Sequence, residues 1–336
     1  MKNYLEACGV PTTRIGDIEV PRLIMGIHPY DGCSYQDRQR DEDNHRAFSR
    51  VEKVAEVLRY AIAEAGLTAV QVDHMLPVLN RLHLQAVWEA EQQTETRVGM
   101  VAYILVPVVL DGEIISSSDR AYATFYAHND KMGGEAFREH MHRDEIVRYN
   151  IGGSGGGMIT PETTPPYTPE DAAGFEIDYA VLERYLGFFE GCDILIADPG
   201  AEIDILAMTG RFDLIREYLG FLRERFSTII TSVHHAGVVL PLLEAEDIPV
   251  DGYLTTVNRP GTFMFPTRDL ALDAIRNATR PVIAIKPMAG GRYLGHKAFE
   301  FVYEEVGVAA SMFGMGTLAQ VEETATAAKE VLGVAA

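Results

Sequence analysis

The sequence is short of cysteine, of cationic residues and of long apolar runs. Its three cysteines (Cys8, Cys33 and Cys192) have no CxxC-like spacing, which argues against a disulfide framework or a structural zinc site. Lys and Arg number 29 against 49 Asp and Glu, so the formal net charge is −20, which repels nucleic-acid phosphates and anionic membranes. No apolar run reaches the ~20 residues of a membrane helix, and no N-terminal signal is visible. We therefore expect a cytoplasmic protein that acts on a small molecule.

A regular alternation of short apolar runs and helical patterns extends over most of the chain. The apolar runs are nearly continuous, as in parallel strands that are buried on both faces. Eight such runs, nearly all followed by a helical pattern, predict a single (β/α)₈ TIM barrel over residues 1–336. The rival is an open doubly wound sheet, which needs a glycine-rich turn after its first strand, where this chain has HPYDG. The expected strands are residues 22–27, 68–72, 98–106, 192–197, 228–233, 252–257, 281–285 and 309–313.

A long insertion, residues 111–178, separates the third expected strand from the fourth. Its first half has a helical pattern over residues 119–148. Its second half, GGSGGGMITPETTPPYTP, excludes regular structure, because glycine costs backbone entropy and proline lacks an N–H donor. Loops of this length in compact domains commonly act as lids. We expect a lid over the barrel mouth, and a disordered insertion is the alternative.

Several segments resemble the aldo-keto reductase superfamily. They are RIGDIEVPRLIMGI near the N-terminus and, in the second half, TSVHHAGVVLPLLE, DGYLTTVN, IKPMAGGR and FGMGTLAQVEETATAAKEVL. The order of the expected strands and helices resembles that superfamily over residues 14–335, and the amino-acid sequence itself resembles it over about 100 residues. It implies a TIM barrel with NADP bound over the seventh and eighth strands.

The catalytic tetrad of that superfamily is not matched. Asp73 corresponds to the tetrad Asp, but the Tyr expected five positions later is Val78. The third strand ends in YILVPV where Lys is expected, and the fourth ends in IADPG where His is expected. The Tyr that protonates a carbonyl oxygen is therefore missing, and the basic residue that would bind a 2′-phosphate near TLAQVEET is not evident. Ordinary carbonyl reduction is in doubt on this ground.

Imidazole and carboxylate groups gather where the expected strands end. In a parallel barrel these ends meet at the mouth where catalytic residues lie, and such groups are the ligands that a divalent metal needs. Neighbouring residues of a strand point opposite ways, so only one of Asp73 and His74, and one of His234 and His235, needs to face the axis. The predicted zinc, manganese or iron ligands are His28, His74 (or Asp73), Asp198 and His234. The alternative is that each histidine hydrogen-bonds to a backbone carbonyl, because no HExxH-type spacing marks a site.

Other residues near the mouth are assigned catalytic or cofactor-binding roles. Lys286 stabilises charge, with a Schiff base or a salt bridge as alternative roles. Asp73, His235 and Tyr30 complete the predicted catalytic set. Glycines after the last two strands lie where barrels often bind phosphate, with tight turns as the alternative explanation. The predicted cofactor-binding residues are Gly290, Gly291, Arg292, Gly314 and Gly316.

Three functions remain open at this level. The first is a metal-assisted lyase, isomerase or hydrolase that acts on a small polar carbonyl or phosphorylated substrate. The second is a divergent NAD(P)-dependent oxidoreductase. The third is a non-catalytic barrel that serves as a binding subunit. An acidic barrel coated with helices is also a candidate homo-oligomer, although no interface can be recognised.

Overall fold

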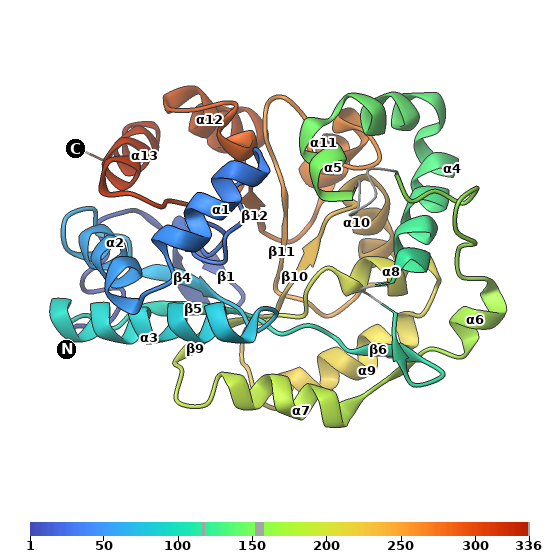
Figure 1. Ribbon diagram of the computed structural model, residues 1–336, viewed down its shortest axis with the longest axis horizontal. Helices are drawn as coiled ribbons and strands as arrows, with labels where there is room; N and C mark the ends of the chain where they lie inside the picture. The colour runs from blue at the N-terminus through green and yellow to red at the C-terminus, as the bar shows by residue number, and fades with distance from the viewer. Residues whose placement is uncertain (116–117, 152–157, 335–336) are drawn as a thin grey trace.

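Eight parallel strands form a barrel that is surrounded by helices (Figure 1). This computed structural model describes residues 1–115, 118–151 and 158–334. The strand order is β10-β11-β12-β13-β3-β4-β5-β9, so each strand lies beside its neighbours in the sequence. The strands are β3 (Leu23–Gly26), β4 (Ala69–Val72), β5 (Gly99–Tyr103), β9 (Ile194–Asp198), β10 (Ile230–Val233), β11 (Gly252–Thr256), β12 (Val282–Ile285) and β13 (Ala310–Gly314). The predicted (β/α)₈ barrel is confirmed.

The seam between β9 and β10 closes the barrel with little backbone pairing. A single parallel bridge joins Ala197 to Ile229, and the Ala197 amide donates to the Thr228 carbonyl at 3.0 Å. The adjoining pair β10–β11 has four residues in register, whereas β3–β4 has one. Side-chain hydrogen bonds therefore contribute more at this seam than between β10 and β11.

The lower part of the barrel is filled by an apolar layer. Each strand contributes an inward residue, such as Ile24, Val101 and Leu254. A hairpin of β1 (Thr12–Ile15) and β2 (Ile18–Pro21) adds Ile15 and Val20 to the same cluster. Because the hairpin packs against this layer, the opposite end, where the strands terminate in polar residues, is left for chemistry.

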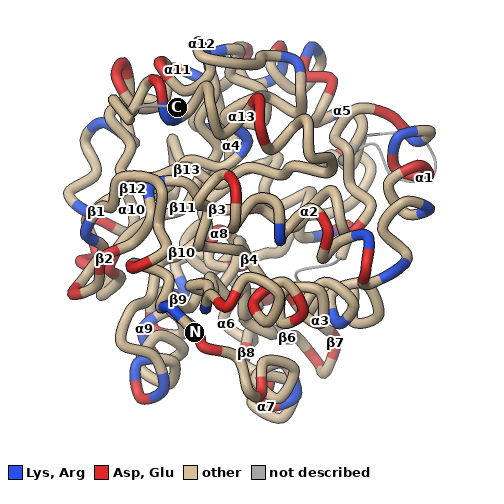
Figure 2. The backbone as a smooth tube through the Cα atoms, turned by 90° about the vertical axis from the view of Figure 1, so that its left-hand side faces the viewer, with Lys and Arg blue, Asp and Glu red and all other residues tan. Residues whose placement is uncertain are grey.

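The outer helices bury one apolar side and expose the other. In α2 (Val51–Ala63), Val54, Leu58 and Ala61 are buried, as the 3.6-residue period requires. Charged residues lie mainly on helices and loops around the strands in Figure 2. No helix in the described part of the chain is long and apolar enough to cross a bilayer. The other helices of this layer are α3 (Pro77–Thr94), α7 (Tyr179–Phe188), α8 (Glu202–Met208), α9 (Phe212–Arg223), α10 (Ala236–Ala245), α11 (Arg268–Asn277), α12 (His296–Glu300, continued by a π-helical turn at Phe301–Val306) and α13 (Leu318–Val331).

Two segments are added to the regular strand–helix repeat. The first is α1 (Arg38–Ala47), which follows β3 and lies beside the mouth. The second is the insertion, whose described part contains α4 (Asp119–Arg143, kinked at Gly134), α5 (Glu145–Ile151) and α6 (Pro169–Ala173). Strands β7 (Glu113–Ile114) and β8 (Glu176–Ile177) flank β6 (Val108–Leu110) in a small antiparallel sheet that sequence patterns did not indicate. Residues 152–157 of the predicted glycine-rich loop lie outside the described residues, and a lid role stays a prediction.

Candidate functional site

Strand periodicity places a ring of polar side chains above the apolar layer. Residues two and four positions after an inward residue face the same way in a strand. Val101 is inward, so Tyr103 is inward as well, and Ile230 is followed by Ser232 and His234 in the same way. Asp73 lies four positions after the inward Ala69. These four polar residues all line the mouth cavity.

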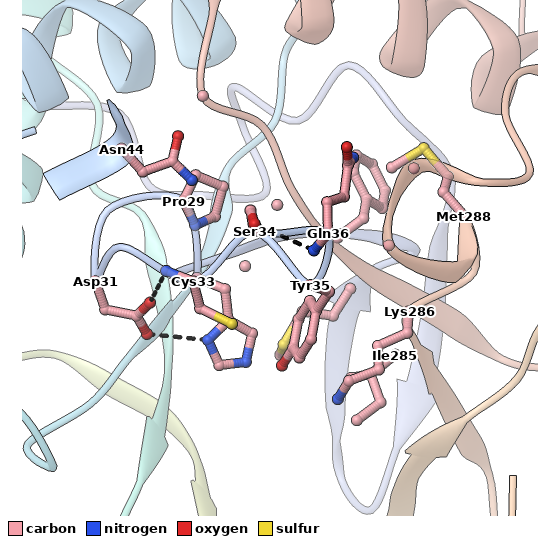
Figure 3. Close-up of a pocket in the computed structure, with 18 of the residues that line it drawn as sticks. Pro29, Asp31, Cys33, Ser34, Tyr35, Gln36, Asn44, Ile285, Lys286 and Met288 are labelled. Carbon is pink, nitrogen blue, oxygen red and sulfur yellow. Dashed lines mark hydrogen bonds and ion pairs between the residues drawn. The ribbon is translucent and has the colours of Figure 1, made fainter. Parts of the chain in front are cut away.

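The mouth cavity is large. Its volume is about 1150 Å³. Its lining includes Asp73, Ser232 and Lys286 near the strand ends, the α13 N-cap Thr317, and Glu323 within α13. The loop after β3 and α1 form one wall, part of which is drawn in Figure 3. A cavity of this volume accommodates a ligand larger than a small substrate.

Lys286 leaves the strand alternation and turns into the cavity. Its backbone is left-handed, with φ of +54°, directly after β12 ends. Its Nζ lies 4.9 Å from the ring centroid of Tyr35 (Figure 3) and 5.1 Å from that of Phe263. Burial lowers the pKa of Lys286 to about 8, against a raising effect of Cys33. At neutral pH this residue is thus an ammonium that can release its proton.

His28 and Asp31 form a hydrogen-bonded pair on the opposite wall. His28 Nδ1 lies 2.9 Å from Asp31 Oδ2, and the Cys33 amide donates to Asp31 Oδ1 at 3.1 Å. This pairing leaves His28 Nε2 free of the carboxylate, as in a histidine that is oriented by an acid. Asp73 has a pKa that burial raises to about 6, against the lowering effect of the Met75 amide. Asp73 is therefore able to exchange a proton near neutral pH.

Tyr103 and Glu202 form a second hydrogen-bonded pair near the barrel mouth. Tyr103 Oη donates to Glu202 Oε2 at 3.3 Å and accepts from the Ala201 amide at 3.2 Å. Gly200, with φ of +85°, permits this approach, since a Cβ there would lie 2.8 Å from Tyr103 Oη. Burial raises the pKa of Glu202 to about 8 and that of Tyr103 well above its usual value. Tyr103 is therefore a poor proton donor, although it lies where the superfamily's Lys was expected.

The four predicted metal ligands do not converge. His74 points away from the axis, stacks on Tyr185 at 4.1 Å and accepts from the Leu105 amide at 3.2 Å. His28 is bound to Asp31, and His234 packs against Phe263 with ring centroids 5.6 Å apart. Over residues 1–115, 118–151 and 158–334, no group of three His, Cys, Asp or Glu side chains is placed to hold a metal.

Asp198, the fourth predicted ligand, ties the barrel seam together. Its Oδ2 accepts from Ser232 Oγ at 2.6 Å, and its Oδ1 accepts from the amides of Ser232 and Gly200 at 2.8 and 3.0 Å. These bonds link β9 to β10 where only one backbone bridge is present. Three donors satisfy the carboxylate, so its role in the structure is to close the barrel.

Two of the predicted catalytic residues lie outside the mouth cavity. Tyr30 is buried, donates to the Met315 carbonyl at 2.7 Å and stacks on His83. His235 points away from the axis toward α4, where its Nδ1 lies 2.6 Å from Asn129 Nδ2. The other two, Asp73 and Lys286, line the cavity.

The predicted cofactor-binding glycines line the cavity, but neighbouring side chains approach them closely. A Cβ at Gly291 would lie 2.5 Å from Gln36 Nε2, and one at Gly314 would lie 2.6 Å from Pro29 Cδ. A Cβ at Gly290 would lie 2.9 Å from Tyr35 Cβ, and one at Gly316 would lie 3.3 Å from the Phe48 ring. Gly290, Gly291 and Gly314 therefore allow the loop after β3 to pack against them. Arg292 binds Glu145 and the Tyr35 carbonyl and so joins the same loop to α5.

Sequence reasoning missed Tyr35 and Tyr103. Tyr103 was detectable, because it follows the apolar Val101 by two positions at the end of a strand. Tyr35 was not detectable, since it comes from an irregular loop with φ of +57° and meets Lys286 only through the fold.

Comparisons with known proteins identify the fold. No family model matches the chain, and no curated protein matches it. Among solved structures, an aldo-keto reductase described as putative, from Pseudomonas aeruginosa, is similar at 14% identity and a TM-score of 0.55, over 97% of this chain and 98% of that one. A Bombyx mori aldo-keto reductase in complex with NADP is similar at 9% identity and a TM-score of 0.51, over 98% and 94%. The barrel is thus of the aldo-keto reductase type.

These findings correct the leading functional hypothesis. The prediction of a metal-assisted lyase, isomerase or hydrolase was wrong, because the similar structures are aldo-keto reductases and the predicted ligands do not form a cluster. The resemblance seen in the sequence is confirmed at the level of the fold.

Proposed function

We propose that the protein is a nicotinamide-dependent oxidoreductase that reduces a small polar carbonyl compound at the barrel mouth. The observation that carries this proposal is the large mouth cavity with the Lys286 ammonium in its lining. The aldo-keto reductase type of barrel, and the NADP in one similar structure, support it.

The cavity is large enough for a dinucleotide. About 1150 Å³ exceeds what a small substrate needs, so a cofactor and a substrate can be accommodated together. Its lining includes the N-terminus of α13, a helix of 14 residues whose first-turn amides favour a negative ligand. Thr317 and Gln320 would hold one part of the cofactor there, and Ser232 and Met312 line the cavity on the strands.

The charge of the groove favours NADH over NADPH. Among its described lining residues, Arg40 and Lys286 are the cations, and Glu323 is contributed by the second turn of α13. A 2′-phosphate needs an arginine or lysine, whereas a carboxylate suits a ribose 2′-hydroxyl. The acidic lining residues are Asp31, Asp37, Asp43, Asp73 and Glu323.

Lys286 replaces the missing tyrosine as the proton donor. When bound, the cofactor supplies the hydride. The Lys286 Nζ donates a hydrogen bond to the carbonyl oxygen of the substrate and then transfers its proton, for which a pKa of about 8 is well matched. His28, oriented by Asp31, offers a second polar contact for the substrate.

Titration with NADH and NADPH tests the proposal. Quenching of the single tryptophan, Trp88, or calorimetry should show NADH binding at least tenfold more tightly than NADPH. Replacing Glu323 with Gln should reduce this preference, and Glu322→Gln is the matched control, because Glu322 does not line the cavity. Failure of both nucleotides to bind at millimolar concentration would overturn the proposal and favour a non-catalytic barrel.

A further inference from the structure

A second cavity lies beside the first, under the inserted helix α4. Its volume is about 240 Å³, and its lining includes residues of α4, α8 and the segment after β11. Helices α4 and α8 lie side by side in Figure 1. His234 lines both cavities, and Phe263, which lies against Lys286, lines this one as well. Six of its fifteen lining residues are phenylalanine or tyrosine: Tyr122, Phe125, Tyr126, Phe137, Phe263 and Phe265.

Asn129 presents a hydrogen-bond acceptor at this cavity. The residue is 1% exposed. Its Nδ2 lies 2.7 Å from the Phe125 carbonyl and 2.6 Å from His235 Nδ1, so both amide hydrogens are used. This fixes the orientation of the amide group, and its Oδ1 has no partner. An unsatisfied buried acceptor of this kind is costly unless a ligand supplies a donor.

Asp204, which lines the same cavity, has a second unpartnered carboxyl oxygen. Its Oδ2 accepts from the amides of His234 and His235 at 2.8 and 3.2 Å, while its Oδ1 has no partner among the described residues. Asp204 is 1% exposed, and Glu202, two residues earlier in α8, lines the same cavity. The described lining contains no Lys or Arg. Two carboxyl groups thus lie at an aromatic cavity without a cation.

We propose that this cavity binds an organic ammonium ion. The unpartnered polar atoms of Asn129 and Asp204 match the N–H donors of an ammonium group, and its positive charge would compensate the two carboxylates. Aromatic faces attract cations strongly when water is excluded. A cavity of roughly 150 Å³ holds benzene, so this one has room for an arylmethylammonium ion.

The proton affinities of the two acids agree with a missing cation. Burial raises the pKa of Glu202 to about 8 and raises the pKa of Asp204 well above its usual value. His235 faces the same cavity and is neutral, since burial lowers its pKa to about 3. A bound ammonium would favour the ionised form of both carboxyl groups.

Calorimetry with benzylammonium and benzyl alcohol tests this site. The two probes have similar shapes, and only the first carries charge. We expect benzylammonium to bind at least tenfold more tightly, and we expect Asp204→Asn to remove this difference while benzyl alcohol binding is unchanged. Asp269→Asn, at a side chain that is 88% exposed, is the matched control. The titration uses neither cofactor nor turnover, so its outcome is independent of the proposed reaction.

A cavity-filling variant covers the case in which Asp204→Asn does not fold. Ile159 lines the cavity, and Ile159→Trp should block benzylammonium binding with no loss of helical circular dichroism. Equal affinity of the two probes for the native protein would overturn the proposal. So would benzylammonium binding that survives Ile159→Trp, because the ligand would then lie elsewhere.

Discussion

The two cavities at the barrel mouth differ in the sign of the ionisable group that each one leaves without an ion pair. The larger one has an acidic lining overall, yet its lysine, Lys286, has aromatic neighbours and no ion pair among the described contacts. The smaller one contains Glu202 and Asp204 with no cation in its described lining. His234 lines both cavities, and Phe263, which lies against Lys286, lines the smaller one. The comparison teaches that the barrel keeps unlike charges apart where pairing would have stabilised both, as expected of groups that are kept for ligands.

The largest effect should come from breaking the hydrogen bonds that join β9 to β10. Asp198→Ala removes three hydrogen bonds across or near β9 and β10, and we expect a loss of about 3 kcal/mol in the free energy of unfolding. Ser232→Ala removes only the hydroxyl bond and should cost about 1 kcal/mol. Urea denaturation measures both. Equal losses for the two variants would contradict the role of the carboxylate in closing the barrel.

The next largest effect should come from removing the Lys286 amine from the larger cavity. Lys286→Met should lower kcat/KM for aldehyde reduction by at least about 100-fold, the usual contribution of a general acid. With a pKa of about 8, the native enzyme should also lose activity as pH rises above 8, because the proton donor is depleted. NADH oxidation over a panel of small aldehydes reports both effects. Lys297→Met, outside the cavity, is the control, and an unchanged Lys286→Met enzyme would rule out this donor.

Neutralising an acid of the smaller cavity should stabilise the protein in a pH-dependent way. The folded-state pKa of Glu202 is about 8, against 4.5 for the ordinary side chain, so the folded state binds more protons and native stability falls as pH rises between these values. The Glu202→Gln variant has no ionisable group at this position, so it does not lose this stability as pH rises. Its advantage over the native protein should grow from pH 5 to pH 8 and reach a few kcal/mol, below the limit of roughly 5 kcal/mol that the difference between pKa values of 4.5 and about 8 sets. An advantage that does not change with pH would show that Glu202 is already ionised in the folded protein.

The smallest effect concerns a buried histidine outside both cavities. His83 is 1% exposed, stacks on Tyr30 at 5.2 Å, and neither ring nitrogen has a partner. Since no cavity ligand explains it, His83→Phe should keep the stacking and raise the free energy of unfolding by about 1 kcal/mol. Thermal and urea unfolding measure the change. A loss of stability would reveal a hydrogen bond to His83 through water.

Local patterns predicted the strands well, and predicted the site only where a side chain follows strand alternation. The order of the strands and the inward direction of Asp73 and His234 follow from period-two spacing. His74 and His235 were assigned to the mouth because they sit at the same strand ends, yet alternation turns them outward. Lys286 was selected correctly as a mouth residue, although its left-handed backbone is not visible in the sequence.

The amino-acid sequence by itself determined the barrel, since eight apolar runs of strand length that alternate with amphipathic helices have few other ways to be buried. It also determined that three of the four tetrad residues of the aldo-keto reductase superfamily are not matched, and that acidic residues outnumber basic ones. Only the tertiary structure decided that Asp198 closes the seam, that Tyr35 and Phe263 flank Lys286, and that α4 covers a second cavity with two unpaired acids. These contacts join residues far apart in the chain, and their geometry depends on loop backbone and helix packing, which have no periodic signal in the sequence.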